Sequence, residues 1–367
     1  MEDQCEKVVM EMEMGLELEG IWQDYGLDEL QRGMDMLFPR YELSLSELLQ
    51  RLLQGDIIGA LTDFMQQGIA EAASSTLGLK NIFVWLLVLG VVSALMSHFV
   101  EVFDRHQVAD LSYYFMYLLM TAILLKCFVQ TAQTASETLE NIVLFNRLLM
   151  PTYLLTVGIA TGGITAGAYY ELLLVLIYGV EELMLGVVIP LIYGYCLLSV
   201  VNGIWIEERL TLFIEFLEKL VGWILKVALG IVTGVSIFQS VLTPVLDSVK
   251  NSALQKMISA IPGVGSAANG VVGLVVGSAV VIKNSVGLLL LLLLLLLCAA
   301  PLIKIFLMAF LLKAAAAFMG IVSDKRITSC TNRTGDAGLL LFKTTGTAML
   351  LFLISIAVVA ITTNRGF

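Results

Sequence analysis

The sequence predicts an all-α fold, a polytopic helical membrane protein with about seven to eight spans and a small acidic helical N-terminal region. Of its 367 residues, 58% are hydrophobic and only 14% are charged, and the mean hydropathy is +0.90. An ordinary soluble domain is about 45–50% apolar and about 25% charged. This composition argues against a soluble enzyme, a disordered scaffold and a DNA-binding module.

Charge divides the chain into two regions, residues 1–80 and residues 81–367. Residues 1–78 contain 16 Asp and Glu against 4 Lys and Arg, whereas the rest of the chain contains 15 acidic and 17 basic residues. The net charge of −10 therefore belongs to the first fifth of the chain. An acidic surface disfavours nucleic acid and anionic lipid, which are held by Lys and Arg clusters. We predict an acidic amphipathic-helical region followed by a multi-pass transmembrane domain.

A capping box from Ser44 to Glu47 begins the clearest helix of the acidic region. Apolar residues follow it at spacings of three and four as far as Met65, so they form one stripe along the helix. Gly55 leaves open whether the helix is one piece. We expect the helix to pack within the region, because its polar face is acidic rather than Lys-rich.

Eight apolar segments follow, and each must be helical because backbone polar groups in lipid have to be satisfied internally. The fourth segment contains Glu181, Glu182 and Pro190, and it forms either one tilted helix or two short re-entrant halves. Residues 298–301 alone separate the sixth segment from the seventh, which indicates a tight hairpin or a broken helix. The predicted spans are 82–100, 111–130, 142–160, 172–201, 220–238, 271–297, 301–322 and 339–362. Lys and Arg are too evenly divided to fix the orientation.

Charged residues inside these segments are candidates for a polar pathway, because charge in lipid is costly. Glu181 and Glu182 are the acidic candidates. Lys283 and Asn284 interrupt an apolar run, which suggests a helix break, a water-filled cavity or a pair with a buried carboxylate. Lysines near the ends of segments need no such role, since their side chains can reach the membrane surface.

Glycines are concentrated in two stretches, near residues 158–167 and 262–277. Small residues allow helix backbones to approach closely, and glycine breaks are tolerated where the backbone lines a cavity. The two stretches therefore either allow close packing of helices or, alternatively, line a pore or form a hinge. The candidate positions are Gly162, Gly163, Gly273 and Gly277.

Enzyme signatures and cofactor sites are absent from the sequence. It has no P-loop and no H-E-x-x-H motif, and its five cysteines lack metal-ligand spacing. His98, Glu101, Asp104 and His106 are the one cluster of metal-ligand types, at the end of the first predicted span where a charged interface is expected. We expect no catalysis, no cofactor and no metal, with an intramembrane hydrolase using this cluster as a remote alternative.

The ordered motifs of the C-terminal third resemble one known family. Residues 270–287, 298–304 and 313–330 look like the signature of the stage III sporulation protein AE family, and residues 148–155 and 43–49 continue the resemblance upstream. The family has no established catalytic residues. Besides Lys283 and Asn284, the positions that match its motifs, all of unknown role, are Cys298, Pro301, Lys304, Asp324, Lys325 and Cys330.

The resemblance implies a multi-pass protein in the mother-cell membrane that faces the engulfed forespore of endospore-forming bacteria. It implies a channel complex that supports forespore development and late sigma-factor activity, in which this chain has a permease-like or scaffold role. The implied partners are other stage III sporulation A-operon proteins, including a cytoplasmic ATPase, and through them the forespore's stage II sporulation protein Q. No nucleic acid is expected. A stand-alone secondary transporter of a small solute is the alternative.

The resemblance also implies that residues 1–80 are extracytoplasmic. Family members usually begin with a signal-like apolar segment that sends this region outside, and the first residues here do not show one. The orientation therefore follows from analogy with the family.

Overall fold

The computed structural model describes residues 31–32, 59, 62 and 66, scattered positions between 84 and 95, and the ranges 106–161, 164–204, 209–258, 265–321 and 323–362. The described chain is almost wholly helical and has no strand, as the sequence predicts. Its elements are α6 (His106–Thr161), α7 (Ile164–Leu183), the π-helix η1 (Met184–Val188), α8 (Ile189–Asn202), α9 (Thr211–Ile258), α10 (Gly265–Met319) and α11 (Lys325–Thr362).

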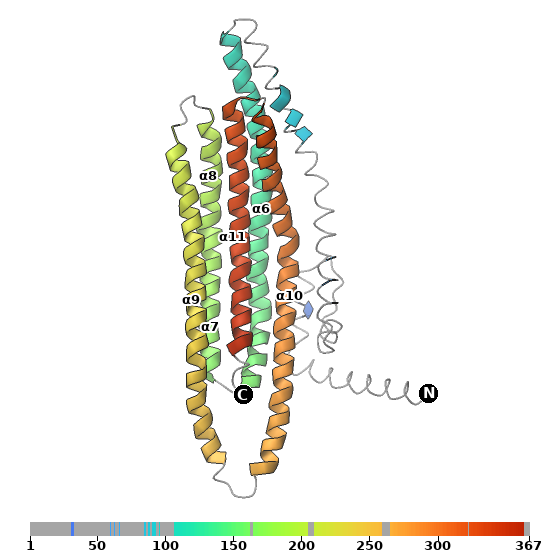
Figure 1. Ribbon diagram of the computed structural model, residues 1–367, viewed down its shortest axis with the longest axis vertical. Helices are drawn as coiled ribbons and strands as arrows, with labels where there is room; N and C mark the ends of the chain where they lie inside the picture. Colours follow the sequence, from blue (N-terminus) through green and yellow to red (C-terminus); the bar gives the residue numbers. More distant parts are fainter. Residues whose placement is uncertain are drawn as a thin grey trace, which may run out of the picture.

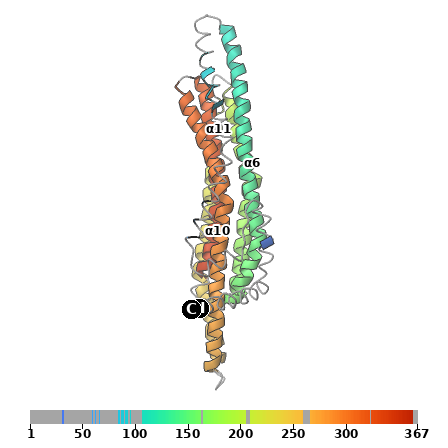
Figure 2. The ribbon, with the colours of Figure 1, turned by 90° about the vertical axis from the view of Figure 1, so that its right-hand side faces the viewer.

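These helices form an elongated bundle in which α11 is central. Figure 1 shows α11 between α9 and α10, and the view turned by 90° in Figure 2 shows α6 running alongside α10 and α11, against which it packs. Helix α11 packs against α6, α7, α8, α9 and α10. A helix enclosed by five others must tolerate burial on most of its surface, and α11 does so with apolar, small and hydroxyl side chains.

Helix α6 joins two predicted spans into one rod. Its 56 residues correspond to about 84 Å at roughly 1.5 Å per residue, so it crosses a hydrocarbon core of about 30 Å once. The expectation of separate spans at 111–130 and 142–160 is therefore wrong. Residues 131–141 contain neither Gly nor Pro, the two residues that most disfavour a helix, so the helix continues through them.

Helix α10 also runs without interruption where a hairpin or break was expected. It continues from Gly265 to Met319 with Pro301 inside it, so residues 271–297 and 301–322 do not form two spans. Proline removes one helical hydrogen bond, to the carbonyl four residues earlier. Residues 298–300 offer no glycine with which to reverse the chain, and transmembrane helices tolerate an isolated proline.

The fourth predicted span is one rod rather than two re-entrant halves. Helix α7 continues through η1 into α8 with helical dihedral angles at Leu183, Val188 and Ile189. The wider turn of η1 ends just before Pro190, whose ring nitrogen cannot donate to the helical ladder. The π-helical turn thus absorbs the register change that the proline imposes.

Four described segments are long and apolar enough to cross a membrane: Tyr114–Leu148, Leu174–Asn202, Gly287–Met319 and Lys325–Ala357. The expected number of seven to eight spans is not confirmed. The predicted span 220–238 lies within α9, which is not among these four. Most of the predicted span 82–100 and of the amphipathic helix after Ser44 lies outside the described residues.

The bundle core is closely packed. Phe145 of α6 meets Phe352 of α11 edge to face, with ring centroids 6.1 Å apart. Helices α10 and α11 approach most closely at two glycines of α11, where an added Cβ would lie 2.9 Å from Ala309 Cβ at Gly338 and 2.7 Å from Lys313 Cγ at Gly335. Glycine is required at this contact because any side chain would separate the two helices.

Candidate functional site

Most buried polar side chains in the described bundle are hydroxyls that bond to their own helix. In α11, five threonines each donate to the carbonyl four residues earlier, at 2.7–3.1 Å. Such a bond satisfies the hydroxyl donor without a partner from another helix. These five residues, which we call the α11 threonines, are Thr331, Thr334, Thr344, Thr345 and Thr347.

Glu181 is a different kind of buried polar group. It lies in the last turn of α7 before η1, its exposed fraction is 0%, and it is the one Asp, Glu, Lys or Arg side chain among the buried residues that the structure describes. Asn146 of α6 approaches its carboxyl group. Cys298 of α10 lies near enough to Glu181 for the two groups to interact electrostatically. Yet both carboxyl oxygens and Asn146 Oδ1 lack a geometrically complete hydrogen bond. We call Glu181, Asn146 and Cys298 the core polar site.

The structure separates the two glutamates that the sequence places side by side. Glu182 is exposed, because the next residue along a helix is turned by about 100° and leaves the buried face that holds Glu181. One turn earlier, Tyr178 accepts a hydrogen bond of 2.5 Å from Arg147 Nη2, and its ring lies 5.0 Å from the guanidinium carbon. Arg147 is also exposed, so the nearest cation of α6 is engaged at the surface while Asn146 points inward.

A second polar cluster joins α8, α9 and α11 near the end of α8. Asn202 Oδ1 accepts the Leu210 amide at 2.8 Å, and Asn202 Nδ2 donates to Thr211 Oγ1 at 3.2 Å. Arg333 Nη2 reaches the same hydroxyl at 3.4 Å. The sequence analysis did not select these residues, although a buried Asn at the end of an apolar run is a signal for a helix-end contact.

Helices α10 and α11 are joined by an ion pair next to their glycine contact. Lys313 Nζ lies 2.7 Å from Asp336 Oδ1, and Asn332 bonds to both side chains at 3.4 Å. The pair is partly exposed, so solvent weakens it. It fixes the register of the two helices rather than forming a reactive site.

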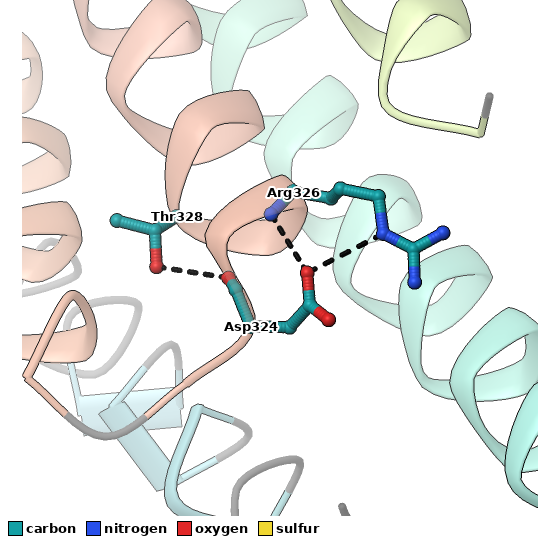
Figure 3. Close-up of polar contacts among 3 residues, drawn as sticks. All are labelled: Asp324, Arg326 and Thr328. Atoms are coloured by element: carbon teal, nitrogen blue, oxygen red, sulfur yellow. Dashed lines mark hydrogen bonds and ion pairs between the residues drawn. The ribbon is translucent and has the colours of Figure 1, made fainter. Parts of the chain in front are cut away.

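Asp324 begins α11 as its N-cap residue. Its Oδ1 accepts the Arg326 amide at 2.8 Å and the Arg326 Nε at 3.4 Å, and its carbonyl accepts the Thr328 hydroxyl at 3.1 Å (Figure 3). Capping of this kind satisfies amides at the start of a helix. Among the family-motif positions, Asp324 thus has a structural role, the neighbouring Lys325 is exposed, and Cys330 is buried.

The remaining sequence candidates lie mainly along α10. Lys283, Asn284, Gly273 and Gly277 are in continuous helix, so of the three alternatives for Lys283 and Asn284 the helix break is excluded. Gly162 and Gly163 lie outside the described residues. Pro301 and Lys304 are half-buried, whereas Cys298 is fully buried and belongs to the core polar site. The structure therefore places Cys298 near enough to Glu181 for the two groups to interact electrostatically.

The outward face of α6 carries a row of polar side chains inside a candidate span. They recur at spacings of four and three, which places them on one face of the helix. All are exposed, and they lie within the segment Tyr114–Leu148. This α6 polar stripe comprises Lys126, Gln130, Gln133, Glu137 and Glu140.

Cysteines and metal-ligand residues form no site in the described part of the chain. Cys127, Cys196, Cys298 and Cys330 are buried and unbridged. No group of three His, Cys, Asp or Glu side chains there could hold a metal ion. The cluster considered at His98 to His106 falls largely outside the described residues, and His106 begins α6.

Comparison with known proteins decides the family. Residues 43–363 match the family described as Stage III sporulation protein AE. The chain belongs to the stage III sporulation protein AE family. It is similar to Stage III sporulation protein AE of Bacillus subtilis (strain 168), with 24% identity over 276 residues that cover 75% of this chain and 69% of the relative. No solved structure matches it significantly. This stage III sporulation protein AE family member is thus a sporulation protein with membrane-like helices.

Proposed function

We propose that this chain is an integral membrane subunit of the mother cell–forespore channel, a secretion-like complex required during endospore formation. The observation that carries the proposal is the family match over residues 43–363. In this role the chain supports forespore development and late sigma-factor activity. It acts as a permease-like or scaffold subunit without catalysis of its own.

The proposed location is the mother-cell membrane around the forespore. The proposed partners are the other stage III sporulation A-operon proteins, including a cytoplasmic ATPase that supplies the energy. Through them the chain is linked to the forespore's stage II sporulation protein Q. Each of these partners is a proposal drawn from family membership.

The α6 polar stripe supports a subunit role. An exposed charge at the centre of a membrane helix costs roughly 2.5–3.5 kcal/mol when it faces lipid. Because one face of α6 carries three charged and two amide side chains, contact between that face and lipid would be energetically unfavourable. A partner protein or water that covers the stripe removes this cost, so the stripe is the face on which we expect the complex to assemble.

Co-purification from sporulating cells tests the proposal. We expect the tagged chain to retain operon partners, and the double variant Glu137→Lys, Glu140→Lys to lose them while remaining in the membrane. Glu182→Lys is the matched control, because Glu182 is equally charged and exposed but lies on α7. Recovery of the unmodified chain without any operon partner would count against a channel subunit.

The stand-alone secondary transporter makes a separate prediction. Purified chain in proteoliposomes would then take up a defined small solute without any other protein. Uptake by the chain alone would favour this alternative, and a panel of solutes without uptake would eliminate it.

A further inference from the structure

The core polar site contains more hydrogen-bond acceptors than donors. Three buried acceptor atoms lack a geometrically complete hydrogen bond, namely the two carboxyl oxygens of Glu181 and Oδ1 of Asn146, although the Asn146 side chain approaches the carboxyl group. A carboxylate offers acceptors only, whereas a neutral carboxylic acid carries one O–H donor. A buried acceptor without a donor destabilises the fold, because its hydrogen bond to water is lost and not replaced. Protonation of Glu181 adds one donor to the site and removes one unsatisfied acceptor.

A neutral Glu181 and the Asn146 amide are complementary. The Glu181 hydroxyl would donate to Asn146 Oδ1, and Asn146 Nδ2 would donate to the other Glu181 oxygen. This reciprocal pair would satisfy all three acceptors with two side chains that already approach each other.

Among the side chains that the structure describes, no buried cation lies in the core around Glu181. Helix α6 presents Asn146, with Arg147 directed to the surface and bonded to Tyr178. Helix α10 presents the Cys298 thiol, and the buried side chains of α9 are all aliphatic. Helix α11 contributes hydroxyls and, at its other end, Cys330, while Glu182 of α7 is exposed. An isolated carboxylate in such surroundings is strongly disfavoured.

The site adjoins the least regular part of the described bundle. Glu181 is followed within three residues by η1, whose five residues form π-helical hydrogen bonds, and then by Pro190. π-Helical turns are uncommon and often occur at functional positions. A change of charge at Glu181 therefore occurs next to η1, where the hydrogen-bond register of the helix already differs from that of an α-helix.

We infer that Glu181 is a proton-binding site in the bundle core, paired with Asn146, and that loss of its proton loosens the α7–η1–α8 rod. The proton passes to water, and the carboxylate that remains must gain hydration or a new donor. The inference concerns the isolated chain, so it stands or falls independently of the partners proposed above.

Infrared spectroscopy of the purified full chain in lipid nanodiscs tests proton binding. At neutral pH we expect a carbonyl band of a neutral carboxylic acid that is lost in Glu181→Gln and retained in the matched control Glu182→Gln. In Asn146→Leu the band should persist but shift, because the acid loses its amide partner. The inference is overturned if Glu181→Gln leaves the band unchanged.

Two further readouts keep the test decisive if Glu181→Gln does not fold. The Asn146→Leu variant keeps the acid, and an unshifted band would refute the pair. Amide hydrogen exchange in the wild type reports on the rod: protection of residues 184–192 should fall at alkaline pH, while protection of residues 337–348 in α11 stays constant. Equal behaviour of both segments would refute the coupling to η1.

Discussion

Helix α11 and the α7–η1 segment both bury polar side chains, but they satisfy them in different ways. The α11 threonines bond to their own helix, so each is satisfied whatever its neighbours do. Glu181 has no such option, because its oxygens need donors from another helix. Burial of polarity alone therefore does not mark a functional site. Dependence on a neighbouring helix, together with an irregular turn, distinguishes the core polar site.

Placing a cation at position 181 should have the largest effect on this contrast. Glu181→Lys places an ammonium group among apolar side chains without a carboxylate partner, so we expect a loss of about 3–5 kcal/mol of stability. Thermal unfolding in nanodiscs would measure it, with Glu182→Lys as the exposed control. Equal thermal stability of the two variants would mean that Glu181 is not enclosed.

The next effect should come from the tight face of α11. Gly338→Leu forces a side chain against Ala309, where even a Cβ would lie 2.9 Å from the Ala309 Cβ. We expect a loss of about 1–3 kcal/mol. Gly346→Ala is the control, because its Cβ would meet only Leu302 Cδ2 at 4.0 Å. A cysteine crosslink between α10 and α11 should form less efficiently in the first variant alone.

Removing the cap of α11 should cost less. Asp324→Ala deletes the acceptor of the Arg326 amide and should lower stability by about 1 kcal/mol. Hydrogen exchange should show the loss of protection in the first turn of α11 only. Lys325→Ala, at the exposed neighbouring position, should leave that turn unchanged.

Replacing a single threonine of α11 should have the smallest effect. Thr345→Val removes a hydroxyl whose acceptor, the Leu341 carbonyl, is also part of the helical ladder. We expect a change below about 0.5 kcal/mol, measured by thermal unfolding. A loss comparable with that of Glu181→Lys would show that the two regions do not differ as described.

The sequence supports the helical class and the family, but not the number of separate helices. Length divides the apolar runs into spans of about 20 residues, whereas the residues between the runs contain no Gly or Pro in α6 and a single tolerated proline in α10. Glu181 was selected because it is charged within an apolar run. Its partner Asn146 was not, since only the packing of α6 against α7 brings the two together.

The unbroken course of α6 has a mechanical consequence. From His106 to Met150 the helix contains neither Gly nor Pro, so it has no sequence-encoded hinge along that length. Because the helix has no hinge there, a tilt where it crosses the bilayer also tilts its far end. The displacement of that end grows with its distance from the bilayer. Movement of the membrane part of this protein would therefore displace the contacts made at the opposite end of α6.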